Sequence, residues 1–342
     1  MKFTEKSGKL YKIPKSCRKI QKVRKIMKET THWLQKTPVV QTGALICCAL
    51  WGSAFPCIKI GYELFHIEAA DTPAQILFAG FRFTLAGILT ILTGSLINRK
   101  LLIPKSAKTA GKIIRLSLLQ TVIQYLFFYV GLAHTTGVKA SVITGMNVFV
   151  AILVASLIFH QESLSSLKIA GCLTGFAGVI LINLTGSGLD SNMRFQGEGF
   201  IFLSAVAYAL SSVFLKRYSE TEHPVLLSGW QFFAGGIIMI LCGLAMGGRP
   251  GHFTPSGTGM LLYLALVSAL AYSLWGILLK YNPVSRVTVF GFMNPVFGVV
   301  LSALLLGETG QASGVRSLLA LVLVCTGICL VNTSSRQEPS DG

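Results

Sequence analysis

Ten long apolar runs take up almost the whole chain and leave little else to fold. A helix that crosses a bilayer needs about 18 or more predominantly apolar residues. Runs of that kind lie near residues 39–60, 74–97, 113–132, 136–158, 167–184, 198–215, 225–246, 258–279, 284–306 and 313–331. Only 13% of the 342 residues are charged, too few to cover a water-soluble domain of this size. The pattern predicts an all-α polytopic membrane protein.

Two of the runs contain nearly the same segment. Residues 146–162 begin Met-Asn-Val-Phe and end Gln-Glu, whereas residues 293–308 begin Met-Asn-Pro-Val and end Gly-Glu. Extending this alignment matches runs one to five with runs six to ten. Because five is odd, the second copy must enter the membrane from the opposite face. The sequence therefore predicts ten transmembrane helices in two five-helix inverted repeats around a central cavity, as in many secondary transporters.

The basic residues sort to one side of the membrane. Of the thirty Lys and Arg residues, twelve lie in residues 1–37 and six between runs two and three. With a cytoplasmic N-terminus, the outer loops hold only Lys139, Arg194, Arg249 and Arg316. This positive-inside bias predicts a multi-pass protein of the cell membrane with both termini cytoplasmic. The net charge of +17 then serves topology, and we expect no nucleic-acid partner.

The expected organisation has four parts. They are a basic cytoplasmic leader (1–37), a first repeat (38–184), a second repeat (197–332) and a short cytoplasmic tail (333–342). In the leader, Ile20, Val23 and Met27 recur near helical spacing among Lys and Arg residues. That pattern fits an amphipathic helix lying on anionic lipids. A solvated leader that only sets orientation is the alternative.

The cysteines and the short motifs give no sign of a metal or of catalysis. Seven of the eight cysteines lie inside apolar runs, where Cys behaves as a small hydrophobe. The chain has no GxxxxGK, HExxH or GxSxG motif. We therefore expect no cofactor, no metal and no enzymatic activity.

Several short segments give the chain a family resemblance. Residues 51–55 read Trp-Gly-Ser-Ala-Phe, residues 81–83 read Phe-Arg-Phe, and the copied segments close at Glu162 and Glu308, each before a short Gly-rich run. Over about residues 40–332 the chain resembles the EamA-type transporters of the drug/metabolite transporter superfamily. The resemblance implies ten helices around a central cavity and movement of small metabolites, amino acids among them, often out of the cell. The basic leader is not part of the family's pattern.

Arg82 is the strongest candidate for substrate binding. It lies well inside run two, where a charge is costly unless it faces the bundle interior or water. In that position it can anchor a substrate carboxylate or phosphate. The alternative is a structural residue that hydrogen-bonds helix ends or polar side chains and locks the helices together.

Other polar and aromatic residues inside the runs are expected to face the same cavity, because polar groups are costly in lipid. The candidates for the cavity lining are Trp51, Gln124, Tyr125, Asn147, Tyr208, Tyr272, Trp275 and Asn294. Each is also compatible with a contact between helices. Pro56 and Pro295 interrupt the helical hydrogen-bond ladder in runs one and nine and are candidate hinges.

The remaining candidates lie at run ends and in run five. Glu162 and Glu308 stand beside helix-starting Ser or Thr residues, which favours capping of the following helix over a proton relay. No Asp or Glu lies deep in any run, so a buried carboxylate relay is not expected. Gly171, Gly175 and Gly178 are spaced for close helix contact, either inside the protein or across a homodimer.

Together these features predict a secondary transporter of small polar metabolites, amino acids or organic anions foremost. It would export or exchange them by alternating access, with the small molecule and the lipid bilayer as its partners. The alternatives are a nucleotide-sugar or lipid-linked sugar carrier, and a non-transporting membrane scaffold or accessory subunit. A scaffold would have no continuous cavity reaching Arg82 and no polar lining, so a sealed, leucine-filled centre would support it.

Overall fold

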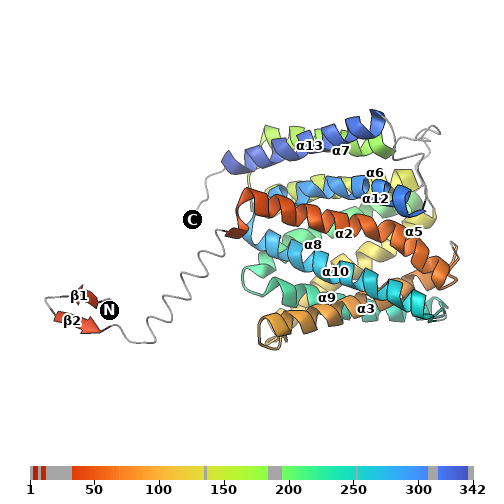
Figure 1. The fold of residues 1–342 in the computed structure, drawn as a ribbon, viewed down its shortest axis with the longest axis horizontal. Helices are drawn as coiled ribbons and strands as arrows, with labels where there is room; N and C mark the ends of the chain where they lie inside the picture. Colours follow the sequence, from red (N-terminus) through yellow and green to blue (C-terminus); the bar gives the residue numbers. More distant parts are fainter. Residues whose placement is uncertain are drawn as a thin grey trace.

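The computed structural model describes residues 3–6, 9–12, 33–68, 70–134, 137–183, 195–251, 253–306 and 315–337. In the leader, strands β1 (Phe3–Lys6) and β2 (Lys9–Lys12) pair antiparallel (Figure 1). The sequence analysis did not predict this hairpin. The amphipathic helix predicted for the leader falls mainly on residues 13–32, outside the described ranges, and stays a prediction.

The first repeat crosses the bundle five times, and each crossing matches a predicted run. Some crossings are single helices and others contain a π-helical turn. They are α2 (Thr37–Leu64); α3 (Thr72–Ile97); α4 (Ala107–Leu116) with η1 (Ser117–Ile123) and α5 (Gln124–Ala133); α6 (Gly137–Leu153) with η2 (Val154–Ile158); and α7 (Ser166–Asn183).

The second repeat repeats this order. Its crossings are η3 (Phe195–Gly199) with α8 (Phe200–Ser219); α9 (Pro224–Ala245); α10 (Pro255–Tyr281); α11 (Val284–Thr288) with the 3-10 segment η4 (Val289–Phe292) and α12 (Met293–Leu306); and α13 (Val315–Gln337). Run nine is therefore a discontinuous helix.

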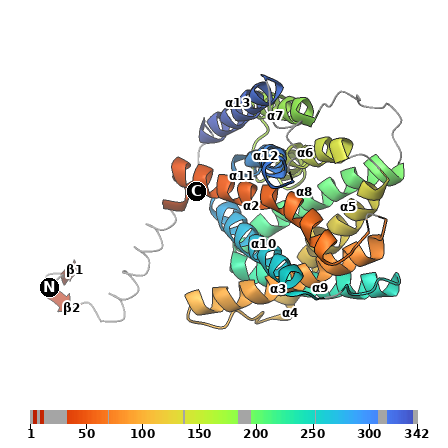
Figure 2. The ribbon, with the colours of Figure 1, turned by 45° about the vertical axis from the view of Figure 1, so that its right-hand side comes forward.

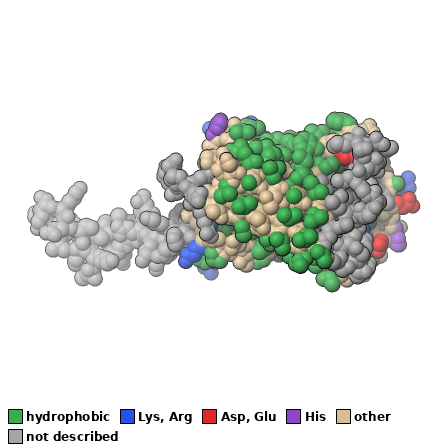
Figure 3. All heavy atoms as spheres, turned by 90° about the horizontal axis from the view of Figure 1, so that it is seen from above, with side chains coloured by type: hydrophobic (Ala, Val, Ile, Leu, Met, Phe, Trp, Pro, Cys, Tyr) green, Lys and Arg blue, Asp and Glu red, His purple; other side chains and the backbone are tan. Residues whose placement is uncertain are grey.

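The helices fit a bilayer. Within the described residues, six are long and apolar enough to cross it alone, and further apolar helices cover 143–158, 166–181 and 318–334. On the face seen in Figure 3, hydrophobic side chains cover the middle of the bundle, and charged side chains gather toward its two ends. The chain is an all-α polytopic membrane protein, as the apolar runs predicted.

Local signals fix where the helices begin. Asp71 precedes Pro73 and accepts a hydrogen bond from the N–H of Ala74 at 3.0 Å, which caps α3. Ser106 caps α4 in the same way through the N–H of Thr109, at 3.1 Å. An oxygen acceptor before the first turn satisfies a backbone donor that the helix itself cannot pair.

The bundle has two ends, which the course of the helices identifies. Helix α2 begins and α13 ends at one end of the bundle, the leader end (Figure 1). There Gln35 Nε2 donates to the carbonyl of Tyr281 at 3.1 Å, and the hydroxyls of Ser165 and Ser334 share a hydrogen bond. At the opposite end, which we call the far end, α2 finishes and α3 begins. Both termini of the helical bundle thus lie at one end, as ten crossings require.

Helix contacts follow a pseudo-two-fold symmetry that exchanges the repeats. The equivalent helices α3 and α9 pack on each other, and so do α7 and α13 (Figures 1 and 2). Helix α2 packs on α10 and α12, and its equivalent α8 packs on α5 and α6. Each of these helix contacts therefore occurs a second time between the equivalent helices of the other repeat, as the inverted-repeat prediction requires.

Glycines bring the two symmetric helix pairs into backbone contact. An added Cβ at Gly87 would lie 2.4 Å from the backbone N of Phe233, so α3 and α9 touch directly. In run five, Gly171 and Gly178 pack in the same way against α13, with backbone oxygens 2.8 Å from each added Cβ. Gly175 packs against the ring of Phe292. These glycines serve internal packing, and a homodimer stays a prediction.

Candidate substrate site

Arg82 is placed deep in the bundle by the start of α3. It stands ten residues after Thr72, the first helical residue, which is about 15 Å of helix from the far end. Only 3% of its surface is exposed. The side chain therefore faces the interior of the bundle, away from lipid, as the sequence predicted for a charge at this depth.

The Arg82 guanidinium has one hydrogen-bond partner among the described residues. Nε and Nη2 both donate to Ser268 Oγ in α10, at 3.2 and 3.0 Å. Ser268 Oγ in turn donates to the carbonyl of Leu264 at 3.1 Å. No described carboxylate forms an ion pair with Arg82. Because arginine has five N–H donors, most of its donors stay available to a ligand.

Aromatic rings fill the interior beside Arg82. Its guanidinium carbon lies 5.1 Å from the centre of the Phe83 ring, and that ring lies 4.6 Å from Tyr125. The hydroxyls of Tyr125 and Tyr272 are 3.3 Å apart. Trp51 continues the group, with its ring centre 5.0 Å from that of Tyr272. We call the whole set the ring cluster: Trp51, Phe83, Tyr125, Phe232, Tyr272 and Trp275.

The crossing of α3 and α9 shows which residues of the two repeats are equivalent. If Gly80 is matched with Gly229 and Gly87 with Gly236, each close contact between the helices corresponds to a second contact with the two helices exchanged. The contacts are Gly80 with Ile240, Gly229 with Ile91, Gly87 with Phe233 and Gly236 with Thr84. By this match, Arg82 corresponds to Gln231 and Phe83 corresponds to Phe232. The rings of Phe83 and Phe232 stack on each other at 5.3 Å.

The hydrogen bond from Arg82 also has a symmetric counterpart. The alignment of residues 146–162 with 293–308 extends back to match Thr121 with Ser268 and Tyr125 with Tyr272. Gln231 Oε1 accepts a hydrogen bond from Thr121 Oγ1 at 2.9 Å, which joins the same two positions as the hydrogen bond that Arg82 donates to Ser268 Oγ, with donor and acceptor exchanged. The protein therefore builds the same contact twice, once with a charged side chain and once with a neutral one.

Comparison with known proteins identifies the family. The model of the EamA-like transporter family matches residues 41–184 and again residues 195–333. The chain belongs to the EamA-like transporter family. This places it among the transporters of the drug/metabolite transporter superfamily, as the sequence resemblance implied.

Relatives of this EamA-like transporter cover most of its length. The "Uncharacterized transporter YvbV" of Bacillus subtilis is 26% identical over 89% of this chain and 96% of its own. The "Probable amino-acid metabolite efflux pump" of Salmonella typhimurium is 26% identical over 83% of this chain and 92% of its own. A solved crystal structure, 16% identical, shares the fold with a TM-score of 0.71 over 88% of this chain and 99% of its own.

Several of the predicted lining residues of the transporter meet around Arg82. The ring cluster contains four of them: Trp51, Tyr125, Tyr272 and Trp275. Tyr208 in α8 packs against the same buried group as Tyr125 and Tyr272. Gln124 precedes Tyr125, and its Oε1 is buried with no hydrogen-bond partner in the described part of the chain.

Asn147 and Asn294 lie instead beside the break in run nine. The carbonyl of Phe290, inside the 3-10 segment η4, accepts a hydrogen bond from Cys48 Sγ at 3.1 Å. Asn147 Oδ1 lies 3.9 Å from where a Cβ on Gly291 would stand. Neither asparagine hydrogen-bonds to the ring cluster in the described part of the chain.

The two candidate hinges occupy different settings. Pro295 is the third residue of α12, directly after the 3-10 segment, so the predicted interruption of run nine coincides with a real break in the helix. Pro56 lies inside α2, which continues as a helix on both sides of it. Whether either position bends during transport stays a prediction.

Glu162 caps a helix in the other repeat. The sequence predicted that it would cap the helix that follows it, which is wrong. Its Oε1 accepts a hydrogen bond from the backbone N–H of Ser285 at 2.9 Å, and its Oε2 accepts one from the Ser285 hydroxyl. Ser285 stands at the start of α11, and sequence spacing cannot reveal a partner brought close only by the packing of two repeats. Glu308 lies outside the described residues.

Lys168 completes this group at the leader end. Its Nζ lies 3.0 Å from Glu162 Oε2, and the two side chains are 0% and 2% exposed. Nζ also donates to the carbonyl of Ser163 at 2.7 Å. The ion pair and its hydrogen bonds satisfy two charges that would be costly to bury alone.

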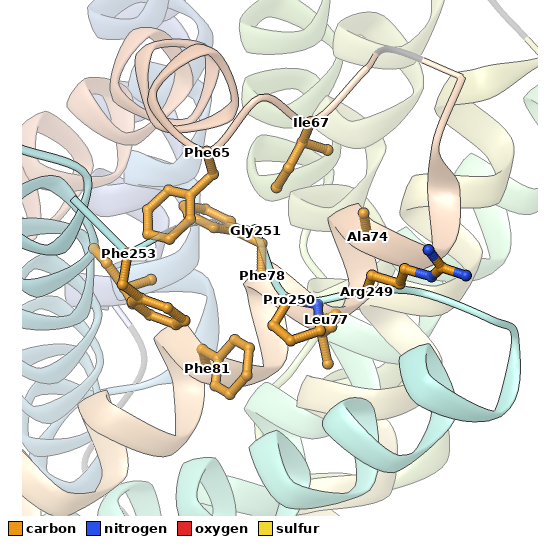
Figure 4. Close-up of a pocket in the computed structure, with 11 residues that line it drawn as sticks. Phe65, Ile67, Ala74, Leu77, Phe78, Phe81, Arg249, Pro250, Gly251 and Phe253 are labelled. Carbon is orange, nitrogen blue, oxygen red and sulfur yellow. The ribbon is translucent and has the colours of Figure 1, made fainter.

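The hollows found at the two ends of the bundle do not include Arg82. The far-end hollow measures about 10 Å³, and aromatic rings line it. Figure 4 shows the rings of Phe65, Phe81 and Phe253 gathered on one side, with the Arg249 side chain extending away from them. A wider, polar hollow at the leader end is lined by Ile158, Phe159, Gln161, Arg217 and Glu220. In this conformation the ring cluster itself fills the centre.

Ser268, Phe232 and Gln231 belong to the site but were not among the candidates for its lining. One signal could have found Gln231, because Gly80 to Gly87 and Gly229 to Gly236 have the same spacing and share one central Phe. No local signal points to Ser268. Its role depends on how α10 packs against α3, 186 residues away in sequence.

Proposed function

We propose that this chain is a secondary transporter that exports or exchanges small carboxylate-bearing metabolites, amino acids foremost, by alternating access. The observation that carries the proposal is Arg82: a buried guanidinium with one hydroxyl partner and no described carboxylate. A buried unpaired charge is unfavourable unless function retains it. A substrate carboxylate can supply the missing partner through paired N–H donors.

The symmetric site supports a functional role for the charge. Gln231 makes the equivalent contact to Thr121 without a charge, so a neutral amide is sufficient to join these helices. Arg82 keeps the contact to Ser268 and adds a cation. The added cation is therefore better explained by ligand binding than by helix packing alone.

The interior supports transport over a passive scaffold. A scaffold predicts that no cavity reaches Arg82 and that the centre has no polar lining. The hollows found in this conformation do not reach Arg82, but the centre holds aromatic rings, two tyrosine hydroxyls and a guanidinium rather than leucine. A pseudo-two-fold bundle of this kind can open toward either end by exchanging the conformations of its repeats. The Salmonella relative named as an amino-acid metabolite efflux pump supports amino acids as the cargo class.

The proposal also assigns an orientation. We place the leader end in the cytoplasm, because the basic leader and the basic segment between α3 and α4 both lie at that end. The far end then faces outward. The variants Lys36→Cys and Glu63→Cys test this orientation, each labelled with a membrane-impermeant thiol reagent in intact cells. The far-end cysteine should react, and the leader-end cysteine should react only after lysis.

Arg82→Gln is the central test, because Gln231 shows that glutamine fits this helix crossing. We expect the variant to insert and unfold like the parent protein but to lose at least about tenfold in transport, since a neutral amide cannot neutralise a carboxylate. Arg82→Lys keeps the charge without the paired donors and should be intermediate. Lys108→Gln, a change at an exposed basic residue of α4, is the matched control.

The readout is amino-acid and organic-acid profiling of cells that overproduce each variant, followed by counterflow of the accumulated species in proteoliposomes. Counterflow that is unchanged in Arg82→Gln would remove Arg82 from the substrate site. A variant that fails to insert or melts far below the parent would assign Arg82 a structural role.

A further inference from the structure

We infer that Trp51 and Trp275 form a second substrate subsite, which binds an uncharged oxygen acceptor on the part of the substrate remote from the carboxylate. The inference rests on the proposed function and narrows its substrate class. It begins from two buried donors: Trp51 Nε1 and Trp275 Nε1 have no hydrogen-bond partner among the described residues. An indole N–H can only donate, so a ligand that satisfies it must bring an acceptor.

These two indoles differ from a tryptophan used only for structure. Trp230 Nε1 donates to the carbonyl of Leu102 at 2.7 Å. Buried donors are normally paired in this way, because leaving one unpaired is unfavourable. Trp275 is 1% exposed, and its ring centre lies 4.9 Å from that of Trp51, so both unpaired donors belong to one compact group of rings.

The subsite lies on the same helix face as the partner of Arg82. Ser268, Tyr272 and Trp275 follow at spacings of four and three residues, which places them on one face of α10. Seven residues correspond to about 10 Å of helix. Helical side chains lean toward the N-terminus of their helix, so the indole leans toward Ser268 and Arg82. A single small molecule can therefore reach from the guanidinium to the indoles.

The indoles also break the symmetry of the bundle. The alignment that matches Tyr125 with Tyr272 matches Phe128 with Trp275, and a looser alignment matches Tyr208 with Trp51. Phenylalanine has no N–H, and a tyrosine hydroxyl can accept as well as donate. Neither indole N–H is therefore repeated at the symmetry-related position, and neither is the charge of Arg82. Departures from symmetry are expected where an asymmetric substrate is held.

The geometry points to a particular chemical class. The substrate carries a carboxylate for Arg82 and, within about 10 Å of it, an amide, ureido, hydroxyl or carbonyl oxygen for the indoles. An aliphatic tail offers nothing to the two donors. A distal ammonium cannot accept from them either.

The test compares two amino acids of similar length. Citrulline has a neutral ureido oxygen at the end of its side chain, and 2-aminooctanoate has an unbranched alkyl chain instead. Binding of each to the purified full-length transporter is measured by isothermal titration calorimetry. We expect citrulline to bind at least about tenfold more tightly, a typical effect of leaving buried donors unpaired in the complex.

Variants then assign the difference to the indoles. Trp275→Phe and Trp51→Phe should each weaken binding of citrulline several-fold more than binding of 2-aminooctanoate. Trp230→Phe is the matched control and should leave the preference as it is. If Trp275→Phe disturbs packing, benzothienylalanine incorporated at position 275 keeps the bicyclic ring and replaces only the N–H with sulfur.

Two results would overturn the inference, and only the second would also overturn the proposed function. Equal binding of the two amino acids, or a preference unaffected by removing the indole N–H, eliminates the subsite but keeps the proposed carboxylate transport. Failure of both amino acids to bind, with Arg82→Gln also unchanged in transport, eliminates the subsite and the proposed function together.

Discussion

Glu162 and Ser285 join the two repeats at the leader end, where the carboxylate accepts from both the backbone N–H and the hydroxyl of the serine. Lys168 neutralises that carboxylate from α7. The group holds the end of run four, the start of run five and the start of run nine in one place.

Glu162→Gln should destabilise the transporter by about 3–5 kcal/mol, because it removes the carboxylate that balances the buried charge of Lys168. The measurement is thermal unfolding of the purified protein in detergent. The double variant Glu162→Gln, Lys168→Met removes both charges and should recover part of the loss. Losses that simply add in the double variant would show that the two side chains are not coupled.

Gly87→Ala should destabilise the transporter by about 1–3 kcal/mol or more. The new Cβ would stand 2.4 Å from the backbone N of Phe233, so α3 and α9 must separate. Gly111→Ala in α4 is the matched control, since an added Cβ there meets nothing within 4 Å. That control should be neutral or slightly stabilising, because alanine favours helix more than glycine does. Equal melting temperatures for the two variants would contradict direct backbone contact.

The loop between α8 and α9 should lose stability in acid. Burial alone would raise the pKa of Glu222, but hydrogen bonds from Lys112 and Thr109, together with the charge of Lys112, hold that pKa below its ordinary value of 4.5. A depressed pKa stabilises the folded state above the ordinary value, and the contribution disappears as the pH falls through the folded-state pKa. The pair is partly exposed, so the effect should stay below about 1 kcal/mol.

Thermal unfolding measured from pH 7 down to pH 3 checks this sign. Glu222→Gln should lose less stability than the parent protein between pH 7 and pH 3. Glu63→Gln, a change at an exposed carboxylate of the far end, is the control and should lose as much stability on acidification as the parent protein does. A parent protein that gains stability on acidification in this window would contradict the assignment.

Deletion of residues 1–30 should spare insertion and transport. The contacts that tie the start of α2 to the bundle involve Gln35 and Thr37, which the deletion retains. Basic residues between α3 and α4 also remain to orient the chain. Transport assays on the truncated protein would reveal a further role for the leader if activity falls while the amount of inserted protein does not.

Much of the fold could be predicted from the sequence. Bilayer thickness sets the length of each apolar run, and the need to satisfy backbone groups in lipid makes each run a helix. The copied segments ending at Glu162 and Glu308 then predicted the inverted repeat. The cost of a charge in lipid was enough to predict that Arg82 faces the interior.

What the tertiary structure alone decided is which residues meet. Ser268 beside Arg82, Ser285 beside Glu162 and the match of Arg82 with Gln231 depend on the rotation and crossing of helices far apart in the chain. Apolar periodicity carries little of that information here, because both lipid and neighbouring helices accept the same side chains. The sequence by itself determined ten helices, their duplication and a buried charge. The packing of the helices decided that Gln231 stands at the position equivalent to this charge, and that two indoles without a described hydrogen-bond partner lie in the ring cluster beside it.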